Sequence, residues 1–477
     1  MTKLIKNTFY YLIGNILSRL GAFLLLPLYT SHLSTEKFGV LELIYTTSAF
    51  LAILFGEGIA HTTIRFYFDP EEQVQRNKVV ITSLIMSLAV STLGGIVVGL
   101  NAAGLSDILF STAEYAGLLR LALVILVFEL SIEVLFAYIR VRQRAIVYVF
   151  ASTAKLFTQL AFSIYLVAYR GMGIEGVLIS NLICVLVIWL ILLIYVIREC
   201  GIQVDFVNVR PMMRYLIPFA SSSLLGVFLS LTDRYLINYY LGLDALGIYS
   251  LAMKFALILT VVLMLPIQKS FGPYRFEIMK SEHAGFVYST LNIFIVAVAS
   301  VMILGISYYI EPVIVLMSNE SYHSAAAYVP ILLLGVLFQA MSYTFQTGIL
   351  ISKKTTVLTK INFFVLATSV GFNFLLIPLY GLYGAATTFL VTGLLISSLT
   401  LFYSQQLFPI VYQHRPVILI ITMLTGLIVA GELLTQNLDL VISLILKLLI
   451  VAAFSLLLMY MNRNDLLRLY RVISNPT

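Results

Sequence analysis

Charged side chains are scarce in this chain. Only 11% of its 477 residues are Asp, Glu, Lys or Arg, whereas 61% are hydrophobic. A soluble domain carries about 25% charged residues, and the mean hydropathy here is +1.01. This composition excludes a large soluble core. It predicts an all-α, polytopic membrane protein, because a lipid-spanning helix satisfies its own backbone hydrogen bonds.

Cysteine is nearly absent as well. The two cysteines, Cys184 and Cys200, lie in or beside one apolar run and provide neither a disulfide framework nor metal-ligand spacing. Residues 171–176 match G-x-G-x-x-G, but a dinucleotide site needs a preceding strand, and here the motif links two apolar runs. P-loop, G-x-S-x-G and H-E-x-x-H motifs are missing from the sequence. We therefore expect no metal, no cofactor and no enzymatic activity.

Fourteen apolar runs are long enough to cross a bilayer, which takes about 20 helical residues. They lie near residues 10–29, 38–66, 79–100, 118–139, 146–168, 174–197, 215–240, 246–267, 286–310, 328–351, 356–377, 382–405, 417–434 and 440–461. Lys and Arg gather in every second connection, and the alternate connections hold acids such as Asp107 and Asp439. The positive-inside rule then places both termini in the cytoplasm. The net charge of +7 therefore reflects topology and not nucleic-acid binding.

A short polar corner occurs twice. Residues 33–43 return 208 positions later as residues 241–251, with Gly39 and Gly247 in register, and Gly173 and Gly381 keep the same offset. Such repetition indicates duplication, here of six helices in parallel orientation. The expected domains are a first lobe at 1–200, a linker at 201–214, a second lobe at 215–406, two accessory helices at 415–462 and a cytoplasmic tail at 463–477.

Ionisable residues at membrane depth are costly and are functional candidates by default. Glu57, His61 and Arg65 are spaced i, i+4 and i+8 in the second run, so they would share one face of a continuous helix. One interpretation is a cavity wall with a proton-active group. The other is a structural Glu–Arg pair near the cytoplasmic end.

Four further charges invite structural explanations. Glu129 and Lys155 each lie about 15 Å from the turn between their helices, at 1.5 Å per residue, which predicts an ion pair. Asp233 and Arg234 lie near the outer end of the seventh run and form either an interfacial pair or part of a cavity.

Arg19 and Lys254 are mid-membrane cations without an evident partner in the sequence, one from each half of the chain. A cationic cavity between the halves would suit a phosphate-bearing substrate. Scattered structural pairing is the alternative. Lys447, in the last run, is expected to contact a neighbour or to snorkel.

Several stretches resemble a known family. They are residues 7–15 (NTFYYLIGN), 27–30 (PLYT), 140–145 (RVRQRA), 232–237 (TDRYLI) and 246–252 (LGIYSLA). Together with the helix pattern they resemble the MOP superfamily, which includes MATE exporters and the Wzx-type polysaccharide-repeat flippases, and in particular its flippase branch. The resemblance covers the whole chain.

The resemblance implies a MATE-like fold with two six-helix lobes around a central cavity, in the bacterial inner membrane. It implies alternating-access transport of an undecaprenyl-diphosphate-linked oligosaccharide, such as an O-antigen or capsule unit, from the cytoplasmic to the periplasmic leaflet, driven by an ion gradient. Membrane lipids, a polysaccharide polymerase and chain-length proteins would be its partners. The cavity would be lined by helices 1, 2, 7 and 8, with substrate-binding cations and coupling or cavity groups drawn from Arg19, Lys254 and Arg234 and from Glu57, His61, Arg65 and Asp233.

In the related lipid II flippases, helices 13 and 14 form a groove for the lipid tail, and Lys447 falls inside helix 14 here. Three other interpretations stay open. A MATE-type exporter would favour cationic substrates and hence an acidic cavity. A membrane-embedded polymerase or ligase usually carries a large outer loop, whereas every outer loop here is short. A purely structural scaffold would not need charges inside several helices.

Overall fold

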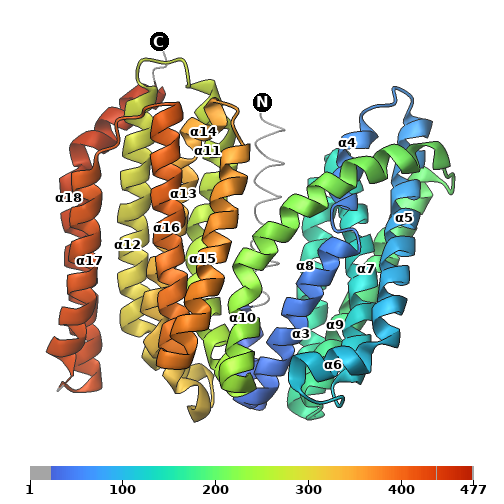
Figure 1. Cartoon of the computed structure of the whole chain (residues 1–477), viewed down its shortest axis with the longest axis horizontal. Coiled ribbons are helices and arrows are strands. Elements are labelled where there is room, and N and C mark those ends of the chain that lie inside the picture. Colours follow the sequence, from blue (N-terminus) through green and yellow to red (C-terminus); the bar gives the residue numbers. More distant parts are fainter. Residues whose placement is uncertain (1–22, 437, 475–477) are drawn as a thin grey trace. The chain divides into compact units, whose positions relative to one another are not determined.

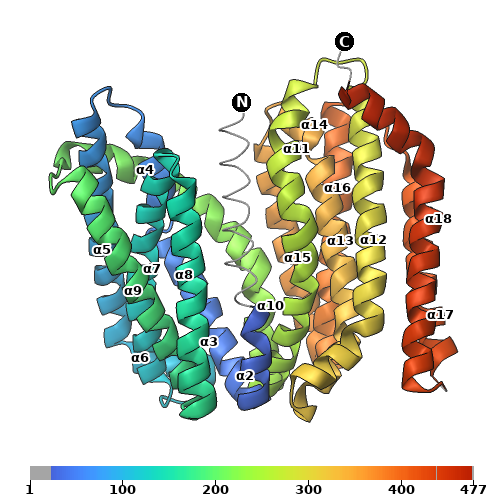
Figure 2. The same ribbon diagram turned by 180° about the vertical axis from the view of Figure 1, so that it is seen from behind.

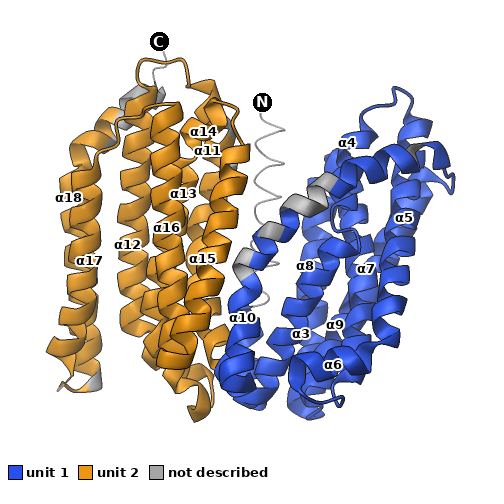
Figure 3. Cartoon of the chain, viewed as in Figure 1, with its two compact units in different colours: residues 1–247 blue, residues 248–477 orange. Residues whose placement is uncertain are grey.

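The computed structural model describes residues 23–436 and 438–474, and every regular element among them is helical (Figure 1). The all-α prediction is therefore confirmed. The chain separates into two compact units, residues 1–247 and 248–477 (Figure 3). Most of the expected helix 1 lies outside the described residues, and Arg19 belongs to that part of the chain.

Unit 1 is built around α7, which packs against α5 and α9, while α9 also packs against α8. Its helices are α2 (Leu26–His32), α3 (Thr35–Leu54), α4 (Ile59–Tyr67), α5 (Gln73–Leu100), α6 (Ala102–Phe110), α7 (Ala116–Val141), α8 (Ala145–Ser163), α9 (Gly173–Cys200) and the first part of α10 (Val209–Leu259). Short π and 3-10 segments, Ile164–Tyr169 and Phe206–Asn208, follow α8 and α9.

Unit 2 is built around α13 and α16, which pack against each other, with α15 on α16 and α12 on α13. Its helices are the end of α10, α11 (Leu265–Glu277), α12 (Ala284–Met317), α13 (Val329–Phe345), α14 (Thr347–Ile351), α15 (Thr356–Tyr380), α16 (Leu382–Leu407), α17 (His414–Thr435) and α18 (Leu440–Ser474). The accessory helices α17 and α18 pack on each other and on α12, at one edge of the unit (Figures 1 and 2).

Twelve helices among the described residues are long and apolar enough to cross a membrane. They correspond to expected helices 2–6 and 8–14. The seventh lies in α10, whose 51 residues contain a kink at Gly242, where φ is +83°. Expected helices 7 and 8 therefore meet at a sharp bend in the repeated corner. A polytopic membrane protein follows from these spans.

The second expected helix is not continuous, which corrects one prediction. The chain forms α3 and α4 with a turn at residues 55–58 between them, and Gly56 has φ +98°. Glycine reaches this region at little cost because it has no Cβ. The i, i+4, i+8 argument for one continuous helical face therefore fails at Glu57, which lies in the turn.

The repeated glycines do have matching geometry. Gly173 and Gly381 have φ of +59° and +58°, and each lies at the start of a helix, α9 or α16. Residues 171–176 therefore lead directly into α9, in agreement with their place between two apolar runs of the sequence.

The two copies of the corner touch each other inside unit 1. A Cβ on Gly39 would lie 2.0 Å from the carbonyl oxygen of Leu243, and a Cβ on Gly247 would lie 2.1 Å from that of Thr35. The Thr35 hydroxyl donates to a carboxylate oxygen of Asp244 beside this crossing. Only glycine allows two backbones to approach so closely.

The first part of α10 runs antiparallel along α3 and α4. Three contacts mark the pairing: Thr47 with Tyr235 (hydroxyls 3.2 Å apart), Phe50 with Phe228 (ring centroids 5.3 Å) and Phe66 with Tyr215 (6.1 Å). These contacts explain why unit 1 extends to residue 247, whereas the sequence repeat ends near residue 200.

Candidate functional site

Three of the sequence-predicted site residues are exposed in unit 1. Glu57 is exposed in the turn after α3, and His61 and Arg65 are exposed on α4, while Ile59, Ala60, Thr62 and Thr63 between them are buried. Arg65 pairs with Asp69 of the next turn. The structural alternative of a Glu57–Arg65 pair is therefore replaced by an Arg65–Asp69 pair.

Asp233 and Arg234 lie at a different level of unit 1. Both are half-buried on α10, and an Asp233 carboxylate oxygen accepts a hydrogen bond from the backbone N–H of Arg234 at 2.9 Å. Because Tyr235 contacts Thr47, this pair lies near the level of Thr47, ten residues from Glu57. That spacing is about 15 Å along the helix. The Nε of Arg234 is buried and has no hydrogen-bond partner within the described part of the chain.

Lys254 is half-buried and belongs to unit 2, beyond the kink in α10. Arg19 lies outside the described residues. A single cationic cavity formed by Arg19, Lys254 and Arg234 thus stays a prediction.

Glu129 and Lys155 lie on neighbouring helices, α7 and α8, with Oε1 and Nζ 3.9 Å apart. This is the pairing expected from their equal depth. Their side chains are 39% and 31% exposed, so the pair contributes little to stability where water reaches it.

One end of unit 1 carries a polar network that the sequence did not reveal. A Glu199 carboxylate oxygen accepts a hydrogen bond from the Tyr138 hydroxyl at 2.7 Å, and the other lies 2.8 Å from Arg144. These residues tie the ends of α7 and α9 to the start of α8. In the sequence Arg144 is only one of the loop cations that set topology.

Unit 2 contains a buried arginine that lies, in the sequence, between two apolar runs. Arg275 on α11 is 2% exposed, and its guanidinium carbon lies 4.9 and 4.5 Å from the ring centroids of Phe271 and Tyr343. Its Nε and Nη1 have no hydrogen-bond partner among residues 23–436 and 438–474. Nearby Tyr412, between α16 and α17, is buried, and desolvation raises the pKa of its phenol. The phenol therefore stays neutral and provides no counter-charge.

Lys447 on α18 does find a neighbour. Its Nζ lies 3.3 Å from Oε1 of Glu432 on α17 and 5.6 Å from the centroid of the Tyr308 ring on α12. Nothing in the sequence pattern indicates Glu432 as this neighbour. The cation thus joins the three helices at the edge of unit 2.

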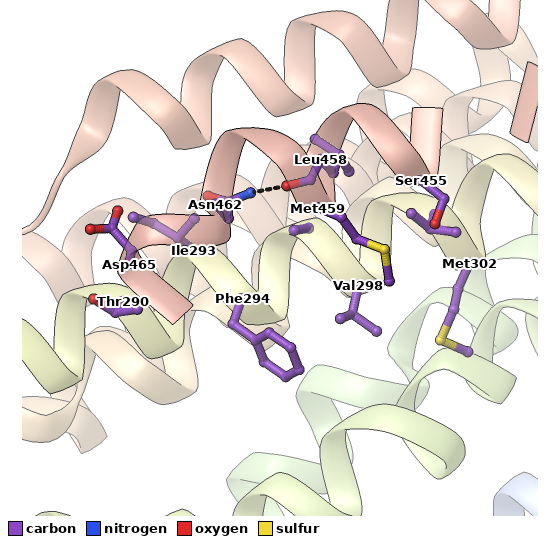
Figure 4. Close-up of a pocket in the computed structure, with 12 residues that line it drawn as sticks. Thr290, Ile293, Phe294, Val298, Met302, Ser455, Leu458, Met459, Asn462 and Asp465 are labelled. Atoms are coloured by element: carbon purple, nitrogen blue, oxygen red, sulfur yellow. Dashed lines mark hydrogen bonds between the residues drawn. The ribbon is translucent and has the colours of Figure 1, made fainter. Parts of the chain in front are cut away.

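An apolar cleft of about 280 Å³ lies between α12 and α18 (Figure 4). Phe294, Val298 and Met302 line it from α12, and Leu458 and Met459 line it from α18. Polar groups occur at one end, where Asn462 and Asp465 lie and the Asn462 amide donates to the Leu458 carbonyl at 2.8 Å. Lys447 is not among its lining residues, so it does not place a charge in the cleft.

Comparison with known proteins agrees with this architecture. The sequence model of a family described as "Polysaccharide biosynthesis protein" matches residues 4–279, which are more than half of the chain. A curated relative, an uncharacterized membrane protein of Haemophilus influenzae, is 25% identical over 313 residues, which are 63% of this chain and 73% of that protein.

Solved structures show the same fold. The lipid II flippase MurJ, in an inward closed conformation, superposes with a TM-score of 0.76 at 12% identity, covering 97% of this chain and all of that one. A multidrug resistance MATE family transporter of the MOP superfamily, in an outward-facing conformation, has a TM-score of 0.60 at 15% identity, covering 85% of this chain and 95% of that one. At these identities the likeness establishes the fold. The chain belongs to the polysaccharide biosynthesis protein family.

Proposed function

We propose that this protein flips a polyprenyl-diphosphate-linked oligosaccharide from the cytoplasmic to the periplasmic leaflet of a bacterial inner membrane. Family membership supports a role in polysaccharide biosynthesis. The observation that carries the lipid part of the proposal is the cleft between α12 and α18.

The cleft suits an isoprenoid tail. Its α12 lining runs from Thr290 to Met302, roughly 18 Å of helix at 1.5 Å per residue. Burial of apolar surface stabilises a bound chain by about 25 cal/mol per Å². A long isoprenoid chain can contact the whole length of this lining, whereas a small cationic compound can contact only part of it, so the cleft favours a lipid-linked substrate over the MATE-type alternative.

The headgroup would be held by cations. A diphosphate prefers guanidinium and ammonium donors. Arg234 offers an unpartnered Nε, and Arg19 and Lys254 are the other proposed members of the site. Exposed Glu57 and His61 are the proposed groups for a coupling proton. Association with a polymerase and with chain-length proteins would follow from the same function.

The direct test is leaflet orientation of an undecaprenyl-diphosphate oligosaccharide in proteoliposomes, with and without an imposed pH gradient. Protein-dependent movement to the opposite leaflet is expected, and the gradient is expected to accelerate it. Export of a cationic dye without any lipid movement would assign the protein to the multidrug branch instead.

A matched pair of variants tests the cleft. Ala297→Trp fills it, because Ala297 lies on its α12 wall. Val315→Trp adds the same side chain on the same helix, at a 50% exposed position away from the cleft. We expect at least a tenfold slower lipid movement for Ala297→Trp and an unchanged rate for Val315→Trp. Equal rates for the two variants would remove the tail from this cleft.

A further inference from the structure

Unit 1 contains a second hollow, far from the α12–α18 cleft in sequence and different in chemistry. It has a volume of about 790 Å³ and is lined by Phe66 at the end of α4 and, at the start of α10, by Arg210, Pro211, Met213, Arg214, Tyr215 and Ile217. The lining includes Arg210, Arg214 and Tyr215. We call it the basic hollow.

Its electrostatics are unbalanced. Arg210 and Arg214 are four residues apart on one helix, so they lie on the same face, where like charges repel. They also lie in the first two turns of α10, which begins at Val209, where the helix dipole already disfavours cations. None of the described residues that line the hollow is acidic. A bound anion would relieve both the repulsion and the dipole penalty.

The hollow is held in shape by one contact beside it and one within its lining. The backbone N–H of Asp205 donates to the Thr82 hydroxyl at 2.9 Å, which fixes the segment before α10 on α5. On the other side, the rings of Phe66 and Tyr215 meet edge to face at 6.1 Å. A site formed in advance loses less conformational freedom when it binds.

The rim of the hollow is amphipathic. Tyr215 and Ile217 are 47% and 63% exposed, and tyrosine is enriched where a protein meets the membrane interface. Two arginine forks match the oxygen geometry of a phosphate. Beside them, the exposed apolar groups would contact the hydrocarbon that follows the phosphate of a lipid. A soluble phosphate would leave these groups unused.

We propose that the basic hollow binds the phosphate of a lipid headgroup, at the end of unit 1 that the distribution of loop charges predicts to be cytoplasmic. The lipid is either the transported polyprenyl diphosphate or an anionic phospholipid of the same leaflet. If the lipid is the transported polyprenyl diphosphate, the proposal rests on the proposed function, and the hollow collects substrate before transport. If the lipid is an anionic phospholipid, the proposal is independent of that function.

The test is binding to the full-length protein in phosphatidylcholine nanodiscs. Three probes are titrated separately: fluorescent undecaprenyl diphosphate, phosphatidylglycerol and soluble pyrophosphate. The variant Arg210→Gln/Arg214→Gln is compared with Arg198→Gln, which removes an exposed arginine of the preceding helix that does not line the hollow. We expect at least one lipid to bind about tenfold more weakly to the double variant, a loss of roughly 1.4 kcal/mol, and no change for Arg198→Gln.

A second variant separates charge from geometry. Arg210→Lys/Arg214→Lys keeps both charges, and with them the topology signal, but loses the planar donors. We expect it to bind with an affinity between those of the wild type and the glutamine variant. Unchanged lipid binding in the glutamine variant overturns the proposal. A wild-type protein that binds soluble pyrophosphate but neither of the two lipids also overturns it.

The three probes also identify which lipid occupies the basic hollow. Arginine-dependent binding of undecaprenyl diphosphate, not displaced by phosphatidylglycerol, assigns the hollow to substrate. Equal binding of phosphatidylglycerol assigns it to bulk lipid. If the wild type transports no lipid-linked glycan but shows arginine-dependent binding of phosphatidylglycerol, the proposed function fails and the phosphate site stands.

Discussion

At the residue scale, the buried charges of this protein differ in how they are compensated. Lys447 has a carboxylate, Glu432, and an aromatic ring within reach. Arg275 stacks on two aromatic rings, and two of its nitrogens are unpartnered among the described residues. A desolvated cation–π contact contributes about 2 kcal/mol, whereas burying an unpaired ion costs several kcal/mol. The two terms nearly cancel for Arg275, so its packing should matter more to stability than its charge.

Arg275 therefore lends itself to a volume test. We expect Arg275→Ala to lower the free energy of unfolding by about 2–4 kcal/mol, because it opens a cavity between Phe271 and Tyr343. Arg275→Met, which keeps most of the volume, should stay within about 1 kcal/mol of the wild type. Thermal unfolding in detergent measures both, with Arg198→Ala as the exposed control. A methionine variant as unstable as the alanine variant would show that the charge itself stabilises unit 2.

For Lys447, loss of the partner's charge should lower the stability of the protein. Its side chain is 9% exposed, whereas that of Glu432 is 57% exposed, so the pair is screened on one side only. Glu432→Gln leaves the ammonium buried without its carboxylate, and we expect a loss of about 1 kcal/mol. Lys447→Met removes the charge and keeps the packing, and should not destabilise the protein. A Lys447→Met variant less stable than Glu432→Gln would contradict this account.

At the scale of helices, the repeated corner brings two backbones into close contact. Gly39 lies on α3 and Gly247 on α10, and each faces a carbonyl oxygen of the other corner. Beside them, the hydroxyl of Thr35 donates a hydrogen bond to the carboxylate of Asp244. The repetition in sequence is thus matched by a crossing at which each copy is the other's neighbour, and this explains why glycine is needed at both positions.

Alanine at either glycine should break this crossing. The new Cβ would lie about 2 Å from backbone oxygen, a clash that side-chain motion cannot relieve, so the helices must separate. We expect Gly39→Ala and Gly247→Ala each to lower the free energy of unfolding by roughly 1–3 kcal/mol. Gly117→Ala on α7, where nothing lies within 4 Å of the added carbon, is the control and should be neutral or stabilising. Wild-type unfolding temperatures for all three variants would mean that the crossing opens freely.

At the scale of the whole molecule, the features predictable from sequence were those that depend on local composition. Helix spans follow from the length and hydropathy of each run, and the corner and its glycines follow from repetition. The continuous second helix was predicted wrongly, because an apolar run does not show where its helix is interrupted, although Gly56 and Gly58 allow local bending. Arg275 and Glu199 were missed because their environments come from distant helices: Phe271 and Tyr343, or Tyr138 and Arg144, meet only in the fold.

Orientation in the membrane belongs to the same scale, and the charge pattern makes it testable. The native cysteines, Cys184 and Cys200, are buried, so the wild type should react little with a membrane-impermeant maleimide. Glu114→Cys, between α6 and α7, lies in a connection poor in cations, whereas Glu282→Cys, between α11 and α12, lies in a cation-rich one, and both positions are exposed. The positive-inside rule predicts labelling of Glu114→Cys in intact spheroplasts and of Glu282→Cys only after permeabilisation. The reverse pattern would invert the topology. It would also place the basic hollow on the outer face, where no substrate is loaded, and so would contradict capture of the transported lipid there.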